Sequence, residues 1–175
     1  MKTIGIISDT HSYWDDRYAI HFADCDEIWH AGDIGNEQVL DRLADVAPVV
    51  RAVWGNADGQ PLRRRLKETE LFTVEGVKVM LTHIGGYPGR YAPGIRNRLD
   101  LYQPKIFVCG HSHILKVMPD RALGVLVVNP GAAGRQGWQK VRTLLRLTLD
   151  NGNIAGCQII ELADDRLHPQ GHLLD

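Results

Sequence analysis

The sequence has no closely spaced pair of cysteines. Its three cysteines, Cys25, Cys109 and Cys157, are far apart, which argues against a disulfide framework and against a zinc site built from thiolates. Cys109 stands inside an apolar run, so we expect it to be a small buried hydrophobe.

The sequence also lacks an excess of charge of either sign and a long apolar run. The 20 basic and 21 acidic side chains give a net charge of −1, which offers no electrostatic footprint for nucleic acid or for an anionic membrane. A small phosphate ester needs only a local positive site, so it is not excluded. No stretch reaches the roughly 20 apolar residues of a membrane span, and the apolar run at residues 3–7 is too short for a signal peptide. We therefore expect a cytoplasmic protein without membrane contact.

The composition is that of a folded protein. Hydrophobic residues make up 44% and charged residues 23% of the 175 residues, enough for one domain with a substantial core. We predict that residues 1–162 form this single domain and that residues 163–175 form a polar C-terminal tail. The hydrophobic content permits a homodimer without requiring one.

The first half of the chain alternates between two patterns. Apolar, β-branched bursts predict strands at residues 3–8, 27–31 and 48–54. Helical spacing predicts helices at residues 18–22 and 36–43, the second capped by Asn36. Strands that alternate with helices are typical of a parallel α/β sheet.

The second half of the chain is richer in strands. We predict a hairpin of residues 71–74 and 77–82 around Glu75-Gly76, a helix at 91–101 and strands at 105–109, 123–128, 143–149 and 154–162. Asn151-Gly152 is a strong signal for a hairpin turn between the last two strands. The whole pattern predicts an α/β protein of two packed sheets with helices outside.

Five of the predicted strands end at side chains that can bind a metal. These are Asp9 and His11 after the first strand, Asp33 and Asn56 after the next two, His83 after residues 77–82, and His111 and His113 after residues 105–109. Ligands of α/β sheets bind beyond the carboxyl ends of the strands, so we expect these residues to meet at one rim. Each motif is weak alone, whereas the ordered set of five is specific.

The ligand types indicate which metals the rim would bind. Carboxylates, one amide and four imidazoles suit Mn, Fe, Zn, Co or Ni better than Ca or Mg. Glycine precedes Asp33, Asn56 and His111, and we expect each glycine to permit a tight backbone turn. The sequence thus predicts two divalent transition metal ions.

The ordered motifs resemble those of the calcineurin-like metallophosphoesterase superfamily. The short chain is similar to its small single-domain bacterial and archaeal phosphodiesterase branch (YfcE-type), over about residues 1–160. The resemblance implies a four-layer αββα sandwich of two mixed β-sheets flanked by helices. It also implies that Asp9, His11 and His113 hold one metal, that Asn56, His83 and His111 hold the other, and that Asp33 bridges them.

The resemblance predicts a metal-dependent phosphoesterase, first of all a phosphodiesterase acting on a small phosphodiester. Two ions about 3.5–4 Å apart can share a hydroxide and aim it at phosphorus. Asp33, Asn56, His83 and His111 would be catalytic by holding these metals, with no side-chain nucleophile. Many members carry a histidine, the usual leaving-group acid, where this chain has Ala57. We therefore expect aryl diesters to be cleaved better than alkyl ones.

Other polar and aromatic side chains are weaker candidates. Arg90 and Asp58 are possible substrate contacts, because Arg90 follows the glycine-rich loop after His83 and Asp58 follows the third strand end. The basic run Arg63-Arg64-Arg65 is interpreted as a solvated helix face, and His30 as a packed histidine. For Tyr13 and Trp14, a cleft wall and simple packing both stay open.

Two other classes of function stay open. One eukaryotic relative of the resembled fold, the retromer scaffold subunit, serves mainly as a protein-interaction surface. A scaffold can lose metal ligands without penalty, whereas here all seven positions hold competent residues. A nuclease is the third possibility, but it needs a basic groove that the composition does not indicate.

Overall fold

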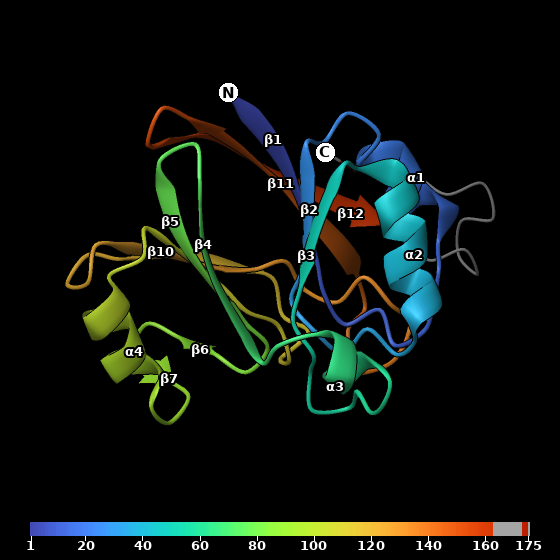
Figure 1. Cartoon of the computed structure of the whole chain (residues 1–175), viewed down its shortest axis with the longest axis horizontal. Helices are drawn as coiled ribbons and strands as arrows, with labels where there is room; N and C mark the ends of the chain where they lie inside the picture. The colour runs from blue at the N-terminus through green and yellow to red at the C-terminus, as the bar shows by residue number, and fades with distance from the viewer. Residues whose placement is uncertain (163–172, 175) are drawn as a thin grey trace.

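The computed structural model describes residues 1–162 and 173–174 of the chain. Two mixed β-sheets pack face to face, with helices on their outer faces (Figure 1). The predicted tail at 163–175 lies outside the described residues, apart from the short strand β13 (Leu173–Leu174).

The first sheet holds the alternating strands of the N-terminal half. Its order is β13-β12-β11-β1-β2-β3, and its remaining strands are β1 (Lys2–Ile7), β2 (Glu27–His30), β3 (Val49–Ala52), β11 (Arg142–Asp150) and β12 (Asn153–Leu162). Strands β1, β2 and β3 are parallel, whereas β11 is antiparallel to β1. The predicted parallel unit is therefore extended by an antiparallel hairpin. The turn of this hairpin is Asn151-Gly152, where both residues have positive φ, as the sequence predicts.

The second sheet is built from the C-terminal half. Its order is β4-β5-β8-β10-β9, from β4 (Thr69–Val74), β5 (Val77–Thr82), β8 (Ile106–Val108), β9 (Lys116–Asp120) and β10 (Val125–Asn129). Strand β9, an edge strand that contains Pro119, was not predicted from the sequence. Proline lacks a backbone donor and is tolerated only at such an edge.

The helices cover the outer faces of the two sheets. Helices α1 (Asp16–His21) and α2 (Glu37–Val46) lie against the first sheet, α4 (Ile95–Tyr102) lies against the second, and α3 (Leu62–Arg65) is a single turn near the lower rim (Figure 1). Asn36 caps α2 as predicted, because its side chain accepts a hydrogen bond from the Val39 amide at 3.2 Å. Helix α4 begins later than predicted, since residues 90–91 pair instead with residues 86–87 as the small hairpin of β6 (Gly86–Tyr87) and β7 (Arg90–Tyr91).

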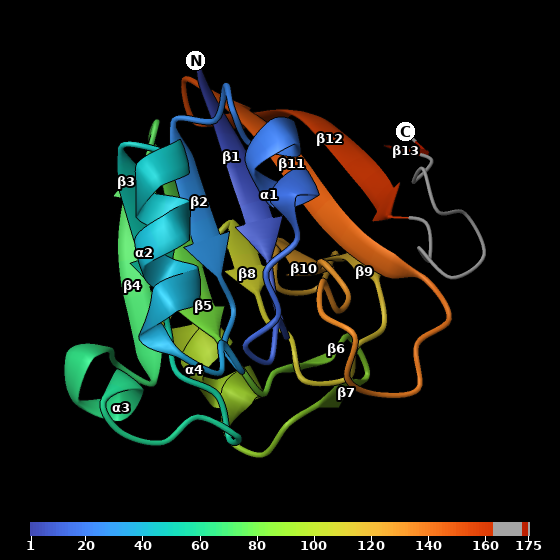
Figure 2. The same ribbon diagram turned by 90° about the vertical axis from the view of Figure 1, so that its right-hand side faces the viewer.

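Three buried clusters fill the spaces between the four layers. The cluster between the sheets includes Ile4, Trp29 and Val108; the cluster under α1 and α2 includes Phe22 and Leu43; and the cluster under α4 includes Leu99 and Phe107. The αββα sandwich of two mixed sheets is therefore confirmed. In Figure 2 the arrowheads of β1 and β2 point to the lower rim, on the same side as α3 and the β6–β7 hairpin. No helix in the described part is long and apolar enough to cross a membrane.

Candidate metal centre

The loops after the strands are tied to one another by backbone hydrogen bonds. The amides of Asp9 and His11 donate to the carbonyls of Gly32 and Asp33, both at 3.0 Å, and the Gly110 amide donates to the His83 carbonyl at 2.9 Å. These bonds join the loop after β1 to that after β2, and the loop after β5 to that after β8. The His111 amide, which donates to Oδ2 of Asp9 at 3.1 Å, connects the two pairs into one rim. The predicted ligands are attached to this rim.

The backbone of the rim is left-handed at most of the predicted ligands. Asp9, His11, Asp33, His111 and His113 have φ between 44° and 73°. A non-glycine residue in this region costs roughly 1–2 kcal/mol, and such residues cluster at functional sites. Five predicted ligands in this conformation mark the rim as the specialised part of the molecule.

The glycines before the ligands serve two different purposes. Gly32 has φ +101° and supplies the predicted turn. The φ angles at positions 55 and 110 are not positive and would allow other residue types. A Cβ on Gly55 would lie 2.2 Å from Oδ1 of Asp33, and one on Gly110 would lie 2.7 Å from Oδ2 of Asp9. These two glycines leave space for the site carboxylates, which corrects the expectation of a turn.

Six of the predicted ligands fall into two compact groups. Potential ligand atoms of Asp9, His11 and His113 lie within 4.8 Å of one another, and so do those of Asp33, His83 and His111. The groups adjoin, because Oδ2 of Asp33 lies 3.7 Å from Nε2 of His11 and 3.2 Å from Nε2 of His83. Asn56 joins the second group through Oδ1, which is 3.0 Å from Nδ1 of His111. The structure thus brings all seven predicted residues together.

In each carboxylate of the centre, one oxygen accepts hydrogen bonds from neighbouring residues and the other oxygen faces the histidines. Oδ2 of Asp9 accepts hydrogen bonds from the Ser8 hydroxyl at 2.6 Å and from the His111 amide at 3.1 Å, and Oδ1 of Asp33 accepts one from the Ala57 amide at 2.9 Å. Oδ1 of Asp9 is buried, and no residue of the described chain hydrogen-bonds to it. It lies 3.2 Å from Nε2 of His113.

Two of the histidines are oriented in the same way. Nδ1 of His83 donates to the Ala31 carbonyl at 2.7 Å, and Nδ1 of His113 donates to Oε1 of Gln139 at 2.9 Å. In each ring the proton is then on Nδ1, which leaves the lone pair of Nε2 facing the carboxylates. Metal-binding histidines commonly have such a second hydrogen bond.

The donor atoms fit a pair of metal ions better than they fit each other. Within the described chain, the buried Nε2 atoms of His11 and His83 have no hydrogen-bond partner, and unsatisfied buried polar atoms are costly. Two ligands about 2.1 Å from one ion and at right angles to each other are about 3 Å apart. The separations of 3.0–3.9 Å found here agree with shared ions.

The carboxylates and the histidines of the centre stabilise each other's charged forms. Burial acts to raise the pKa of Asp33, but nearby His83 and the Ala57 amide outweigh it and lower this pKa to about 2. Burial acts to lower the pKa of His83, but Asp33 and Asp9 raise it above its ordinary value. Contact with Asp9 raises the pKa of His113. Without a metal, the histidine protons would neutralise the carboxylates, a role that bound cations can take.

A match to a protein-family model identifies the superfamily of the chain. The model described as the calcineurin-like phosphoesterase superfamily domain matches residues 1–152. The chain belongs to this superfamily. Metallophosphoesterases work with divalent metal ions, which agrees with the chemistry of the donor set.

Curated relatives of this phosphoesterase domain support the assignment. A probable metallophosphoesterase of Methanocaldococcus jannaschii is 33% identical over 139 residues, which is 74% of this chain and 67% of the relative. A probable metallophosphoesterase of Methanothermobacter thermautotrophicus is 30% identical over 136 residues, or 74% of this chain and 76% of the relative.

Solved structures with the same fold are more distant in sequence. Vps29 of Chaetomium thermophilum has a TM-score of 0.80 at 14% identity and covers 99% of this chain and 95% of its own. A structure described as a novel archaeal phosphodiesterase has a TM-score of 0.68 at 22% identity, covering 91% and 99%. At these identities the likeness concerns the fold.

Three hollows surround the metal centre of the calcineurin-like domain. The first, about 290 Å³, lies beside Asn56 and His83 and includes Trp54, Arg63 and Arg98. The second, about 220 Å³, is lined by residues that include Tyr87, Arg90, His111, Ser112 and Lys116. The third, about 400 Å³, is lined by His111, Ser112, His113, Ile114, Gly137, Trp138 and Gln139. The predicted candidate Arg90 thus borders the site, while its role stays a prediction.

Asp58 has a different place from the one predicted. Its side chain is buried, and its two oxygens accept hydrogen bonds from the amides of Ile34, Gly35 and Gly55 at 2.9–3.1 Å. Because both oxygens serve the backbone of the rim, the geometry does not support a substrate contact. Asp58 instead joins the loops that follow β2 and β3.

The basic run Arg63-Arg64-Arg65 is an exposed face of α3, as predicted, and Arg63 makes additional contacts. Its guanidinium donates to the carbonyls of Asp58 and Asn56 and lies over the Trp54 ring, 4.1 Å from the centroid. Arg63 therefore stands beside the site. His30 is packed under the rim, as its position in β2 predicts.

Three residues that border the site, Gln139, Lys116 and Trp138, were not predicted from the sequence. Gln139 orients His113 from 26 residues away, and no motif marks it. Trp138 stands alone among polar residues and glycine, which was a usable signal. Of the two aromatic residues left open, Trp14 packs edge-on against Tyr18, at 5.3 Å between ring centroids.

Proposed function

We propose that this protein is a dinuclear metal-dependent phosphodiesterase that hydrolyses a small phosphodiester with water. One observation carries the proposal: Oδ1 of Asp9 lies 3.8 Å from Nε2 of His11 and 3.9 Å from Nε2 of His83, and all three buried atoms have no hydrogen bond among the described residues. The rest of each carboxylate and of the His83 ring is anchored to the chain. Such a preformed set of donors is suited to metal ions.

The bound metals would supply positive charge at the phosphate and an activated water as nucleophile. Asp9, His11 and His113 would hold one ion and Asn56, His83 and His111 the other. Asp33 would serve both ions, because its Oδ2 faces His11 of one group and His83 of the other while Oδ1 is engaged by the Ala57 amide. The chain's contribution is to fix these donors before the substrate arrives, so that little reorganisation accompanies the reaction.

No side chain of the described rim is a convincing nucleophile. Cys109 follows β8, but burial raises the pKa of its thiol to about 12, so it is protonated at neutral pH. The Ser8 hydroxyl is buried and donates to Asp9. Direct attack by water accounts for the hydrolysis without a covalent intermediate.

The proposal is tested with bis(4-nitrophenyl) phosphate. The purified protein is stripped with a chelator and then supplied with Mn, Fe, Zn, Co or Ni in turn. We expect turnover to disappear on stripping and to return with at least one metal, with close to two ions bound per chain by elemental analysis. A stripped protein that stays fully active, or one that no metal reactivates, would contradict the proposal.

The scaffold and nuclease alternatives stay predictions. The likeness to Vps29 structures concerns the fold, and one of them, from Entamoeba histolytica, is described as complexed with zinc. The net charge of −1 offers no extended surface for a nucleic-acid polymer. The cytoplasmic location, the homodimer and the choice of metal also remain predictions.

A further inference from the structure

Trp138 is fully exposed at the edge of the metal centre. The exposed fraction of its side chain is 100%, and that of Ile114 in the same hollow is 58%. Exposed large apolar side chains that gather at one site mark binding surfaces. A tryptophan face stacks favourably on another planar ring, such as a nucleobase.

The loop that carries Trp138 is held against a metal-binding side chain. Gln139 accepts a hydrogen bond from Nδ1 of His113 at 2.9 Å, and its amide nitrogen donates to the carbonyls of Gly134 and Gln136 at 3.1 and 2.7 Å. Gly137 lies so close that a Cβ there would be 2.3 Å from Nδ1 of His113. The backbone on both sides of Trp138 is therefore held close to the metal centre.

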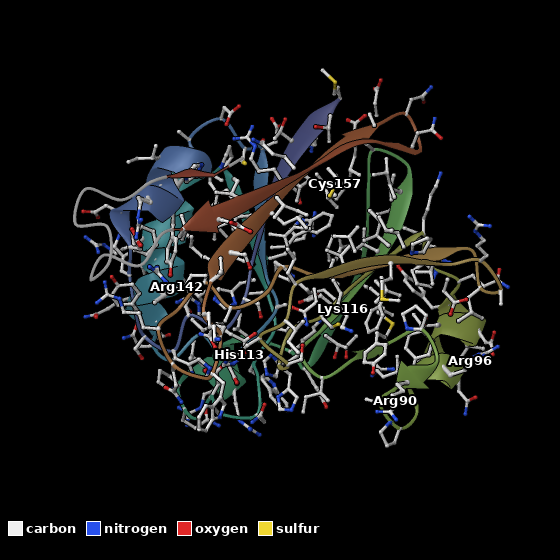
Figure 3. The ribbon with its side chains drawn as sticks, turned by 180° about the vertical axis from the view of Figure 1, so that it is seen from behind. Arg90, Arg96, His113, Lys116, Arg142 and Cys157 are labelled. Atoms are coloured by element: carbon white, nitrogen blue, oxygen red, sulfur yellow. The ribbon has the colours of Figure 1, made fainter. Side chains whose placement is uncertain are left out.

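The neighbouring hollow carries basic side chains, whereas the Trp138 hollow carries exposed apolar ones. It shares His111 and Ser112 with the Trp138 hollow and is lined by the cations Arg90 and Lys116. Nζ of Lys116 lies 3.8 Å from the centroid of the Tyr87 ring, and among the described residues neither cation is paired with a carboxylate. In Figure 3, Lys116 and Arg90 are labelled on the same side of His113. Cations without a carboxylate partner that line the same hollow as His111 suit a second phosphate.

We infer that the substrate is a dinucleotide-sized phosphodiester with a terminal phosphate. This inference rests on the proposed phosphodiesterase function. One nucleobase stacks on Trp138 beside Ile114, the bridging phosphate lies at the metal centre, and the terminal phosphate pairs with Lys116 and Arg90. The Trp138 subsite and the Lys116–Arg90 subsite both border the metal centre, so they select a short substrate. The net charge of −1 agrees with this, because a long nucleic acid would need a more basic protein.

The test compares a dinucleotide that carries a 5′-terminal phosphate with the same dinucleotide lacking it. Trp138→Ala should lower kcat/KM for both dinucleotides by about 5- to 100-fold, while Trp138→Phe retains most of the activity, because stacking needs only a ring. The wild type should prefer the phosphorylated substrate. The double variant Arg90→Ala and Lys116→Ala should remove that preference, which we expect to be roughly three- to tenfold.

Matched controls separate the subsites from general surface changes. Leu101→Ala removes an apolar side chain that is 88% exposed on α4, and Arg121→Ala removes an exposed cation from the β9–β10 turn. Both should behave as wild type. As a second readout, a dinucleotide with a non-hydrolysable bridging linkage should quench tryptophan fluorescence in the wild type. This quenching should be smaller in Trp138→Phe, where Trp54 is the remaining tryptophan beside the centre, and equal quenching in the two proteins would contradict stacking on Trp138.

The two hypotheses fail in different ways. Metal-dependent cleavage of bis(4-nitrophenyl) phosphate, with no terminal-phosphate preference and no effect of Trp138→Ala on dinucleotides, would overturn the substrate inference and leave the phosphodiesterase intact. A wild type that cleaves no diester with any metal would overturn both.

Discussion

Nε2 of His30 lies 3.0 Å from Oγ1 of Thr10, the residue between the proposed ligands Asp9 and His11. Nδ1 of the same ring accepts a hydrogen bond from the Gly32 amide at 3.1 Å, so the ring proton is on Nε2 and is donated to Thr10. Thr10 in turn donates to the Ile34 carbonyl at 2.9 Å. A neutral, fully buried imidazole therefore joins the two loops that carry Asp9 and Asp33.

This buried imidazole should make the stability of the protein depend on pH. Burial lowers the pKa of His30 from 6.5 to about 4, although Asp58, Asp9 and Asp33 act to raise it and His83 acts to lower it further. Between these two pH values the unfolded chain binds a proton that the native chain excludes. The free energy of unfolding should thus fall as pH falls from 6.5 to 4, by about 3 kcal/mol from this residue.

The variant His30→Asn tests the pH effect, because an amide oxygen can still accept from the Gly32 amide. Urea unfolding of both proteins between pH 4 and 7 gives the free energy of unfolding of each as a function of pH. We expect the variant to be less stable at pH 7 and its stability to vary less with pH. Parallel curves for the two proteins would show that His30 titrates normally.

Asp33 and Asp58 are close neighbours in the rim and should respond differently to the same substitution. Asp33→Asn should lower metal-dependent turnover by roughly 100-fold or more, with a small effect on stability. Asp58→Asn should lower the free energy of unfolding by about 2–4 kcal/mol, because three backbone amides lose a charged acceptor. Turnover and chemical denaturation of both variants separate the roles; equal loss of turnover with equal stability would contradict them.

Gln139 should control metal affinity through His113. Gln139→Ala removes the acceptor that holds Nδ1 of His113 at 2.9 Å, and loss of such a partner costs typically 10- to 100-fold in metal affinity. Competition with a chelator measures the change. Gln136→Ala is the control, because Gln136 contributes its backbone carbonyl to the loop. Unchanged affinity in Gln139→Ala would show that His113 is oriented without it.

Ala57 stands where we expect many members of the superfamily to carry a leaving-group acid, and its small side chain leaves room for one. Its side chain is exposed beside the centre, and its amide donates to Asp33. Ala57→His keeps that amide and adds an imidazole, so hydrolysis of an alkyl phosphodiester should rise by about tenfold while the aryl rate changes little. The pH profile for the alkyl substrate should become bell-shaped. Ala57→Gln controls for size, and an equal gain with glutamine would exclude acid catalysis as the cause.

Much of the fold and all seven proposed ligands could be predicted from the sequence. Apolar bursts ended by polar residues gave the positions of the buried strands, and the rule that parallel strands present ligands at their carboxyl ends brought Asp9, Asp33 and Asn56 together. Asn36 and Asn151-Gly152 carry local signals for a cap and a turn, and both are confirmed. These features are encoded within a few residues of where they act.

The remaining features depend on contacts between distant segments. Gln139 matters because its loop folds onto His113, and Arg63 because a short helical turn brings it to Trp54. Asp58 was misjudged because its three amide partners come from two separate loops. Neither spacing nor periodicity records such encounters, so the surroundings of the ligands are harder to predict than the ligands themselves.

The left-handed backbone at Asp9, His11, Asp33, His111 and His113 has a consequence for heating. The strands have ordinary β conformations. The strained residues of the rim keep their conformation only while the surrounding structure holds them in place. Warming should therefore let the rim relax while the β-structure is still intact. Catalytic competence should disappear several degrees before the circular dichroism of the strands does, and added metal should narrow that gap.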